Sequence, residues 1–168
     1  MIIKPALLTP IQNICDQNGF GCGGDNPVGL KMQFLTDNKR VYSQVSVPLA
    51  MAGWDQTIHG GIISTIMDEI MWRAVVYLLQ KIAVTKSITV DFIKPLYVER
   101  ELNAVGFIQE IQSEKDVLVT GEIYSEQDIL CAKAYGTFAP MTPESAVRSG
   151  MMSSEYMERF MSIRNQND

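Results

Sequence analysis

Residues 59–81, HGGIISTIMDEIMWRAVVYLLQK, decide the fold of this chain. After a His-Gly-Gly turn, apolar residues occupy most of the circumference that a helix would present. A helix that is apolar on nearly all sides is buried inside a protein. The uninterrupted apolar runs are too short, and the middle too charged, for a membrane-spanning helix. The stretch therefore predicts one long helix that the rest of the chain encloses.

The start of this helix is a candidate site for binding a carbonyl oxygen. The first turn of a helix carries free N–H groups and the positive end of the helix dipole. Because Gly60 and Gly61 have no side chains, a ligand oxygen could approach these groups closely and be stabilised as an oxyanion. A plain glycine turn explains the same residues, and a lone histidine such as His59 is more often a helix cap than a catalyst.

Two neighbouring carboxylates lie in the middle of the helix, about 100° apart around its axis. Glu69 shares a stripe with Arg73 four residues later and can pair with it. Asp68 has no cation nearby on its own helix, and an unpaired carboxylate among apolar neighbours is costly to bury. Asp68 is therefore a functional candidate, although it could also reach water or cap a loop. Its apolar neighbours on the helix are Met67, Met71 and Trp72.

The spacing of Gly61 and Asp68 bears on the oligomeric state. Seven residues return nearly to the same helix face, but they separate the two groups by roughly 10 Å along the axis. A carboxylate that acts on a carbonyl must lie within a few ångströms of it. If both groups act on one substrate, a second copy must supply one of them, which predicts a two-fold homodimer with two composite sites.

Composition limits the class of protein. The chain has 168 residues, of which 46% are hydrophobic and 20% charged, enough for one domain with a real core. A net charge of −5 without a basic stripe argues against nucleic acid as a partner. The cysteines Cys15, Cys22 and Cys131 fit a reducing compartment better than a disulfide framework. A single histidine argues against a zinc site. The first residues lack a signal-peptide core, so we expect a cytoplasmic protein that needs no membrane.

The remaining segments predict an α+β fold. Residues 30–35 and 40–47 are expected to be strands before the helix, and 82–92, 102–111, 117–124 and 129–139 strands after it. Short links make the last four antiparallel neighbours in a sheet that curls around the helix. Gly19, Gly21 and Gly24 spell G-x-G-x-x-G, but no strand precedes them and a turn follows, which excludes a dinucleotide site.

Taken in this order, the segments resemble the hotdog-fold acyl-CoA thioesterases of the phenylacetate-pathway (PaaI-like) type. The resemblance covers about residues 21–140 and is most specific at HGGIISTIMDE, where an acidic residue follows nine positions after the histidine. GCGGDNPVGL and VTKSITVDFIKP support it. It implies a hotdog domain at 29–140, with an antiparallel sheet of about six strands around one long central helix. An N-terminal arm and Gly-rich loop occupies 1–28, and the extension 141–168 contains a short amphipathic helix from about Ser153.

The resemblance also implies an activity, the hydrolysis of an acyl-CoA thioester by a homodimer or a dimer of dimers (homotetramer), without a metal or other cofactor. Gly61, with Gly60 beside it, would donate a backbone N–H to the thioester carbonyl, which His59 would help to polarise. Asp68 of the partner chain would be the base or the nucleophile. Thr85 matches a hydroxyl position that orients water in some members, although it could equally be a strand residue that packs its methyl group.

Substrate contacts are expected from a second group of residues, on the helix and on the segments beside it. Some family members have Asn or Gln six residues before the histidine, where this chain has Gly53, and Gln56 is near enough to substitute. Trp54 could contact a ligand or staple its loop, and the staple is the favoured interpretation. The substrate-binding candidates are Gln56, Trp54, Met67, Met71, Trp72 and, for the CoA phosphates, Lys94.

Two alternatives remain open at this stage. One is hydration or dehydration of an acyl thioester on the same fold, which usually requires a histidine and an acid facing each other. The other is a non-catalytic acyl-CoA binding protein.

Overall fold

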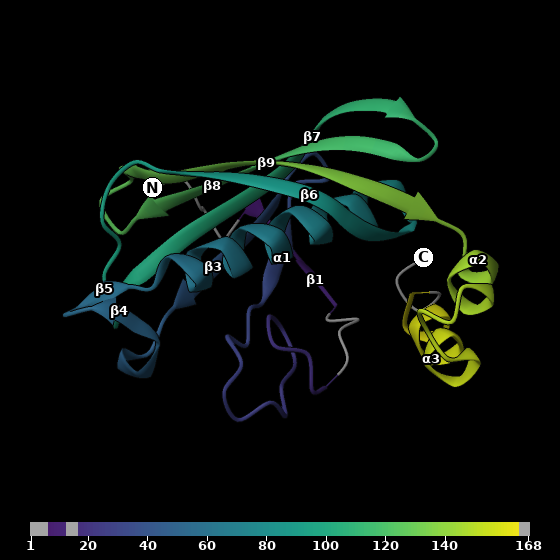
Figure 1. The fold of residues 1–168 in the computed structure, drawn as a ribbon, viewed down its shortest axis with the longest axis horizontal. Coiled ribbons are helices and arrows are strands. Elements are labelled where there is room, and N and C mark those ends of the chain that lie inside the picture. The colour runs from purple at the N-terminus through teal and green to yellow at the C-terminus, as the bar shows by residue number, and fades with distance from the viewer. Residues whose placement is uncertain (1–6, 13–16, 165–168) are drawn as a thin grey trace.

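The computed structural model describes residues 7–12 and 17–164 (Figure 1). Its central element is α1 (Gly60–Leu79), the long helix expected from the sequence. The side chains of Ile66, Met67, Ile70 and Met71 on this helix are fully buried. Their burial removes most of the helix circumference from water, which is the main force that fixes the helix inside the fold.

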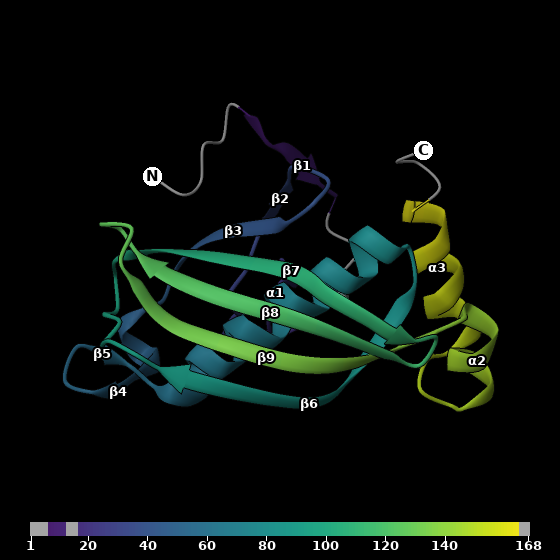
Figure 2. The same cartoon turned by 90° about the horizontal axis from the view of Figure 1, so that it is seen from above.

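A seven-stranded antiparallel sheet covers one side of α1, in the order β1-β2-β3-β7-β8-β9-β6 (Figure 2). The four strands after the helix are β6 (Ile82–Phe92), β7 (Glu101–Ser113), β8 (Asp116–Ser125) and β9 (Leu130–Met141). These agree with the expected strands to within two residues. Gly106 lies where a Cβ atom would come within 2.5 Å of the Ile70 carbonyl oxygen, so the helix backbone packs directly on β7. The expected hotdog architecture, a sheet around one central helix, is confirmed.

The segments before the helix are shorter and more broken than expected. The first predicted strand is reduced to β2 (Phe34–Thr36), while β3 (Val41–Ser46) lies where the second was expected. Three short strands were not predicted: β1 (Thr9–Ile11) at one sheet edge, and the hairpin of β4 (Ala52–Trp54) and β5 (Thr57–Ile58) before α1. The described residues thus form nine strands, not about six.

The C-terminal extension forms α2 (Pro143–Arg148) and α3 (Ser154–Arg164), of which only α3 was expected. Met157 and Phe160 of α3 pack with Val76 and Ile82, next to the C-terminal end of α1 (Figure 1). The extension therefore lies at the end of the molecule opposite the His-Gly-Gly turn. No helix in the described ranges is long and apolar enough to cross a membrane.

The Gly-rich loop lies against α1 on the side opposite the sheet (Figure 1). A Cβ atom at Gly21 would come within 2.3 Å of a carboxylate oxygen of Glu69, so a larger residue there would displace the Glu69 side chain. Cys22 is joined in a disulfide, which corrects the interpretation of the cysteines as reduced, while Cys131 is a free, buried thiol. Cys15 lies outside the described residues.

Candidate functional site

The helix begins with a side-chain cap. His59 stands at the N-cap position, and the Gly61 N–H donates to its Nδ1 atom at 2.9 Å. The N–H groups of Ile62 and Ile63 donate to the His59 carbonyl oxygen. Across the described ranges, the Gly60 N–H donates to no acceptor. The open backbone donor at this terminus is therefore on Gly60, while the N–H expected to bind the carbonyl, that of Gly61, is engaged by the cap.

The cap fixes the tautomer of His59. Because Nδ1 accepts a hydrogen bond, it carries no proton, and in a neutral imidazole the proton then lies on Nε2. The His59 side chain is exposed, so Nε2 is available to donate to a ligand. His59 can therefore cap the helix and present a donor at the same time, and the two sequence interpretations of this residue are compatible.

The backbone around His59 is closely packed. A Cβ atom at Gly53 would come within 2.8 Å of the His59 Cα atom, which leaves no room for an Asn or Gln side chain at this position. Gln56 is exposed and near the turn. The Trp54 side chain is 85% exposed, so the favoured interpretation of Trp54 as a staple of its loop was wrong.

Asp68 and Thr85 are brought together by the fold. The Thr85 hydroxyl donates to Oδ1 of Asp68 at 2.7 Å. Thr85 belongs to β6, the strand at the free edge of the sheet (Figure 2). The β6–β9 ladder shifts register between Thr85 and Ser87, and a bulge of this kind re-aims side chains next to it. Asp68 is only half-buried and therefore remains accessible to water.

Glu69 has a different environment on the other side of the same helix. Burial raises its pKa, and the charge of Arg73 offsets this in part. Arg73 is fully buried, and burial lowers its pKa to about 10 despite the charge of Glu69. The guanidinium lies 4.5 Å from the centre of the Phe34 ring and 5.2 Å from that of Trp72. The expected pairing of Glu69 and Arg73 is thus part of the core.

The apolar residues next to Asp68 do not form an open wall in this chain. Met67 and Met71 are fully buried and pack against Gly121 of β8. The Trp72 indole is half-buried and donates its N–H to the Ala83 carbonyl oxygen at 2.8 Å. The expectation that Met67 and Met71 line a substrate groove is not met, because the sheet of the same chain covers them.

An open pocket of about 380 Å³ adjoins the start of α1 instead. Gly60 and Ile63 line it from the helix, and Phe92 and Lys94 from the end of β6 and the segment after it. Phe92 is 56% exposed, which is unusual for so large an apolar side chain. The sequence did not single out Phe92, although its position at the end of an alternating strand was a usable signal. Asp68 is not part of this pocket.

Comparison with known proteins found similarity to one protein family. The family model described as the thioesterase superfamily matches residues 55–132, just under half of the chain. The matched range begins in the turn after β4 and includes β5, the His-Gly-Gly turn, Asp68 and Thr85. The resemblance to the PaaI-like hotdog thioesterases is confirmed. No significant match was found among curated proteins.

Solved structures of hotdog thioesterases share this fold at low sequence identity. A thioesterase superfamily protein matches with a TM-score of 0.67 and 16% identity over 73% of this chain, which spans 60% of that protein. The E. coli PaaI protein from the phenylacetic acid degradation operon matches at 0.58 and 20%, over 67% of this chain and 80% of PaaI. A Streptococcus mutans protein bound to acetyl-CoA matches at 0.61 and 20%, over 66% and 89% of the two chains.

Proposed function

We propose that this chain hydrolyses an acyl-CoA thioester to a free acid and CoA, at two composite sites of a homodimer. The observation that carries the proposal is the hydrogen bond between Thr85 and Asp68, at the free sheet edge and seven residues beyond the glycine turn. A carboxylate held by one hydroxyl and open to water has the environment of a base or a nucleophile. The match of residues 55–132 to the thioesterase-superfamily model and the acetyl-CoA bound in a structural neighbour support the substrate class.

The helix terminus supplies the groups for the thioester carbonyl. Gly60, whose N–H has no acceptor in the described ranges, lines the pocket, the exposed His59 beside it offers an Nε2 donor, and Gly61 would add its own N–H if the imidazole turned away. These donors stabilise the negative charge that develops on the carbonyl oxygen. Ile63, Phe92 and other apolar residues of the pocket favour an aliphatic or aryl acyl group.

Asp68 of the partner chain completes the reaction. As a base, it takes a proton from water while the water oxygen attacks the carbonyl carbon. The tetrahedral intermediate then collapses, the C–S bond breaks, and the CoA thiolate leaves and is protonated. As a nucleophile, Asp68 instead forms a mixed anhydride, which water hydrolyses. Single turnover in ¹⁸O-labelled water separates the two routes, because only the anhydride route can leave the label in the Asp68 carboxylate.

The dimer is expected to form along β6. Among the described strands, β6 pairs only with β9, so its other edge has free N–H and C=O groups. Thr85 lies on this strand and Phe92 at its end, and both are exposed. A second β6 paired there would bring its own helix alongside in the opposite sense, which places Asp68 of one chain near the glycine turn of the other.

The test is thiol release from a panel of aliphatic and aryl acyl-CoAs, together with complementation. Asp68→Asn removes the carboxylate. Gly61→Val blocks the helix terminus, because even a Cβ atom there would lie 3.0 Å from Nδ1 of His59. Each variant alone should be inactive. When equal amounts of the two variants are mixed, dissociated and reassociated, about half of the dimers contain one chain of each variant. Each of these heterodimers has one intact site, so about a quarter of wild-type activity should return.

The outcomes are distinct. Recovery on mixing supports a site shared between chains, and no recovery from two folded variants overturns it. Binding of acyl-CoA by the wild type without thiol release overturns hydrolysis and favours the non-catalytic binder. Water addition to an enoyl-CoA without thiol release favours the hydratase.

A further inference from the structure

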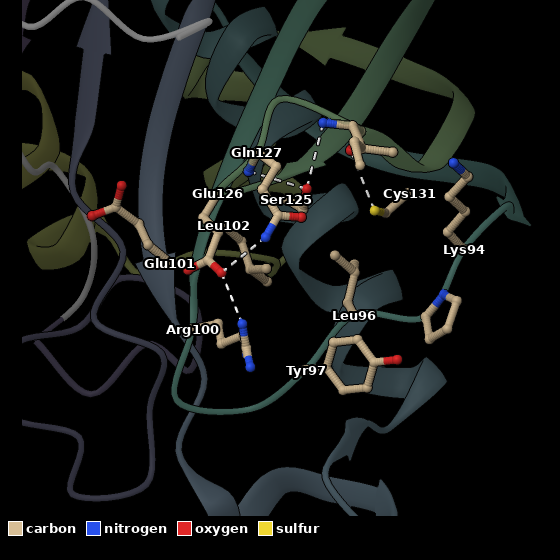
Figure 3. A pocket seen from close by; sticks show the side chains of 12 residues that line it. Lys94, Leu96, Tyr97, Arg100, Glu101, Leu102, Ser125, Glu126, Gln127 and Cys131 are labelled. Carbon is tan, nitrogen blue, oxygen red and sulfur yellow. Dashed lines mark hydrogen bonds and ion pairs between the residues drawn. The ribbon is translucent and has the colours of Figure 1, made fainter.

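Large apolar side chains are exposed at the end of the molecule that carries the His-Gly-Gly turn. Trp54, in the β4–β5 hairpin, is 85% exposed, and Leu49, just before the hairpin, is 56% exposed. Tyr97, on the connection from β6 to β7, is 43% exposed (Figure 3) and forms a β-bridge with Thr57 of the hairpin. Single exposed apolar residues are ordinary, but a group of them around one hairpin indicates a surface that another protein covers.

The opposite end of the molecule, where α2 and α3 lie (Figure 1), carries an apolar groove between these two helices. The groove has a volume of about 510 Å³, and Val147 and Met157 line it from the two helices. Its rim carries Glu144, Arg148 and Glu158, all of them exposed. The groove lies outside the range that matches the thioesterase-superfamily model. It is therefore a feature of this chain that the family pattern does not account for.

Strand β6 runs between these two ends. Its first residue, Ile82, pairs with Met141, the last residue of β9, shortly before α2 begins. Its last residue, Phe92, lies beside Gly60 at the start of α1. When two copies of β6 pair antiparallel about a two-fold axis, the start of one strand lies beside the end of the other. The hairpin of each chain is thereby brought towards the α2–α3 groove of the other chain.

Pairing along β6 alone would leave this dimer without an apolar centre. The exposed residues of β6 before Phe92 are all polar: Thr85, Lys86, Ser87, Thr89 and Asp91. Stable interfaces bury roughly 1,200–2,000 Å² in total and depend on a few buried aromatic anchors. A tryptophan contributes about 150–250 Å² when it is buried, and a two-fold dimer buries it twice. The two hairpins, each in a groove of the other chain, therefore supply apolar area that the strand edge lacks.

We propose that the α2–α3 groove binds the β4–β5 hairpin of a second copy of this chain, with the partner's Trp54 as the anchor between Val147 and Met157. This inference rests on the proposed function for its β6 dimer. A large, rigid aromatic side chain that enters a groove between two helices has the character of an interface hot spot. The C-terminal extension is then the part of each chain that grips its partner.

The docked hairpin also positions the glycine turn, because the hairpin leads directly into it. The His59 N–H donates to the Met51 carbonyl oxygen at 3.2 Å, and Ile58 pairs with Ala52 across the hairpin. The hairpin and the start of α1 are thus held together by the backbone. A hairpin that is fixed by the extension of one chain holds its glycine turn opposite Asp68 of that same chain.

The first experiment measures the dimer dissociation constant of the full chain by sedimentation equilibrium. Trp54→Ala should weaken the dimer about thirtyfold, as expected for an aromatic anchor. Val147→Asp places a charge in the groove and should weaken the dimer about tenfold. Leu7→Ala is the matched control, because this side chain is 75% exposed but precedes β1, at the sheet edge opposite β6. Its dimer should be unchanged. Thermal unfolding followed by circular dichroism establishes that each variant is folded.

The double variant Trp54→Ala/Val147→Asp gives the sharper result. Because both substitutions act on one contact, their effects should not add. Val147→Asp should weaken the dimer of Trp54→Ala less than about threefold. Full additivity in folded variants, or an unchanged dissociation constant in Trp54→Ala, would overturn the docking of the hairpin in the groove.

A second experiment detects the contact directly by chemical cross-linking. Gln56→Cys, in the turn of the hairpin, is combined with Ser154→Cys on the groove wall, and the full chain is treated with a short bismaleimide. The hairpin and the groove lie at opposite ends of one chain (Figure 1), so a link between these two thiols joins two chains. Covalent dimers should form. The control Leu7→Cys/Ser154→Cys should form none above the wild-type background.

The cross-linking result separates this inference from the proposed function. No covalent dimer, together with recovery of thiol release when Asp68→Asn and Gly61→Val are mixed, rejects the docked hairpin but keeps the thioesterase. Covalent dimers, together with no thiol release by wild type from any acyl-CoA of the panel, reject the thioesterase but keep the docked hairpin.

Discussion

Asp68 and Glu69 are neighbours in sequence, carry the same charge and lie on the same helix, yet their surroundings in the fold differ. Asp68 faces the free edge strand, where its described partner is the Thr85 hydroxyl at 2.7 Å. Glu69 faces the Gly-rich loop and the buried guanidinium of Arg73. A rotation of about 100° around one helix thus places one half-buried carboxylate beside the hydroxyl of an edge strand and the other beside a buried guanidinium.

The different partners of Asp68 and Glu69 distinguish a functional carboxylate from a structural one on a buried helix. Burial raises the pKa of Glu69, and a cation supplied by the same helix offsets part of the cost. For Arg73 the balance is similar, since burial lowers its pKa to about 10 despite Glu69. A carboxylate whose lone pairs are engaged by groups of its own chain has few left to accept a proton or to bind a substrate. Asp68, half-buried and held by one hydroxyl, retains its remaining lone pairs for water.

The largest expected effect of a single substitution is that of Asp68→Asn on activity. Loss of the base or nucleophile should lower kcat by about a thousandfold, or about 4 kcal/mol in the activation free energy. The amide keeps the shape of the side chain, so the free energy of unfolding should change by less than about 0.5 kcal/mol. Thiol release and urea unfolding measure the two quantities. A variant that loses stability in proportion to activity would place Asp68 with Glu69 as a structural residue.

Arg73→Ala should show the opposite pattern. It removes the largest fully buried side chain and its contacts with Phe34 and Trp72, and it leaves Glu69 enclosed without its cation. We expect a loss of about 4 kcal/mol in the free energy of unfolding, as for truncation of other large core side chains. Urea unfolding measures this loss. The protein that remains folded should keep a kcat within about threefold of wild type, and a much larger loss would connect Arg73 to the chemistry.

Thr85 tests how Asp68 is held. Thr85→Val removes the hydroxyl but keeps the branched shape that suits a strand. With its one described hydrogen bond gone, the Asp68 carboxylate is less well oriented, and kcat should fall about tenfold. Thr85→Ser restores the donor and should recover most of the activity. Equal kinetics of wild type and Thr85→Val would leave the packing of the Thr85 methyl group as the role of this residue.

Much of the fold could be predicted because its strongest signals are local. The apolar residues of 59–81 predicted α1, and alternating residues between charged turns predicted the four strands from β6 to β9. The short strands could not be found in this way. β1 is only three residues long and contains Pro10, and β4 contains Gly53, so neither shows the alternation on which the prediction rests.

The candidate site was predictable only in part. The residue types at His59, Gly61 and Asp68 pointed to their region, but their contacts depend on tertiary structure. The Thr85–Asp68 hydrogen bond lies beside a register shift in β6, which no sequence pattern reveals. Met67 looked like part of a substrate wall because periodicity indicates an apolar face without indicating what covers it. The sheet of the same chain covers that face.

The smallest expected effect is that of Glu69→Gln on the pH dependence of stability. Its folded-state pKa is raised above the ordinary value of 4.5, so the folded protein holds this proton more tightly than the unfolded chain. The stability that Glu69 contributes is therefore complete below pH 4.5 and is lost as the pH rises through the folded-state pKa. Glu69→Gln resembles the protonated form at every pH and should escape this loss. Urea unfolding is measured for both proteins from pH 4 upward. The free energy of unfolding of the variant should rise relative to that of wild type as the pH increases, by at most about 1.4 kcal/mol per pH unit. Parallel curves would mean that Arg73 compensates the Glu69 carboxylate fully, and the contrast with Asp68 would then rest on the different partners of the two carboxylates alone.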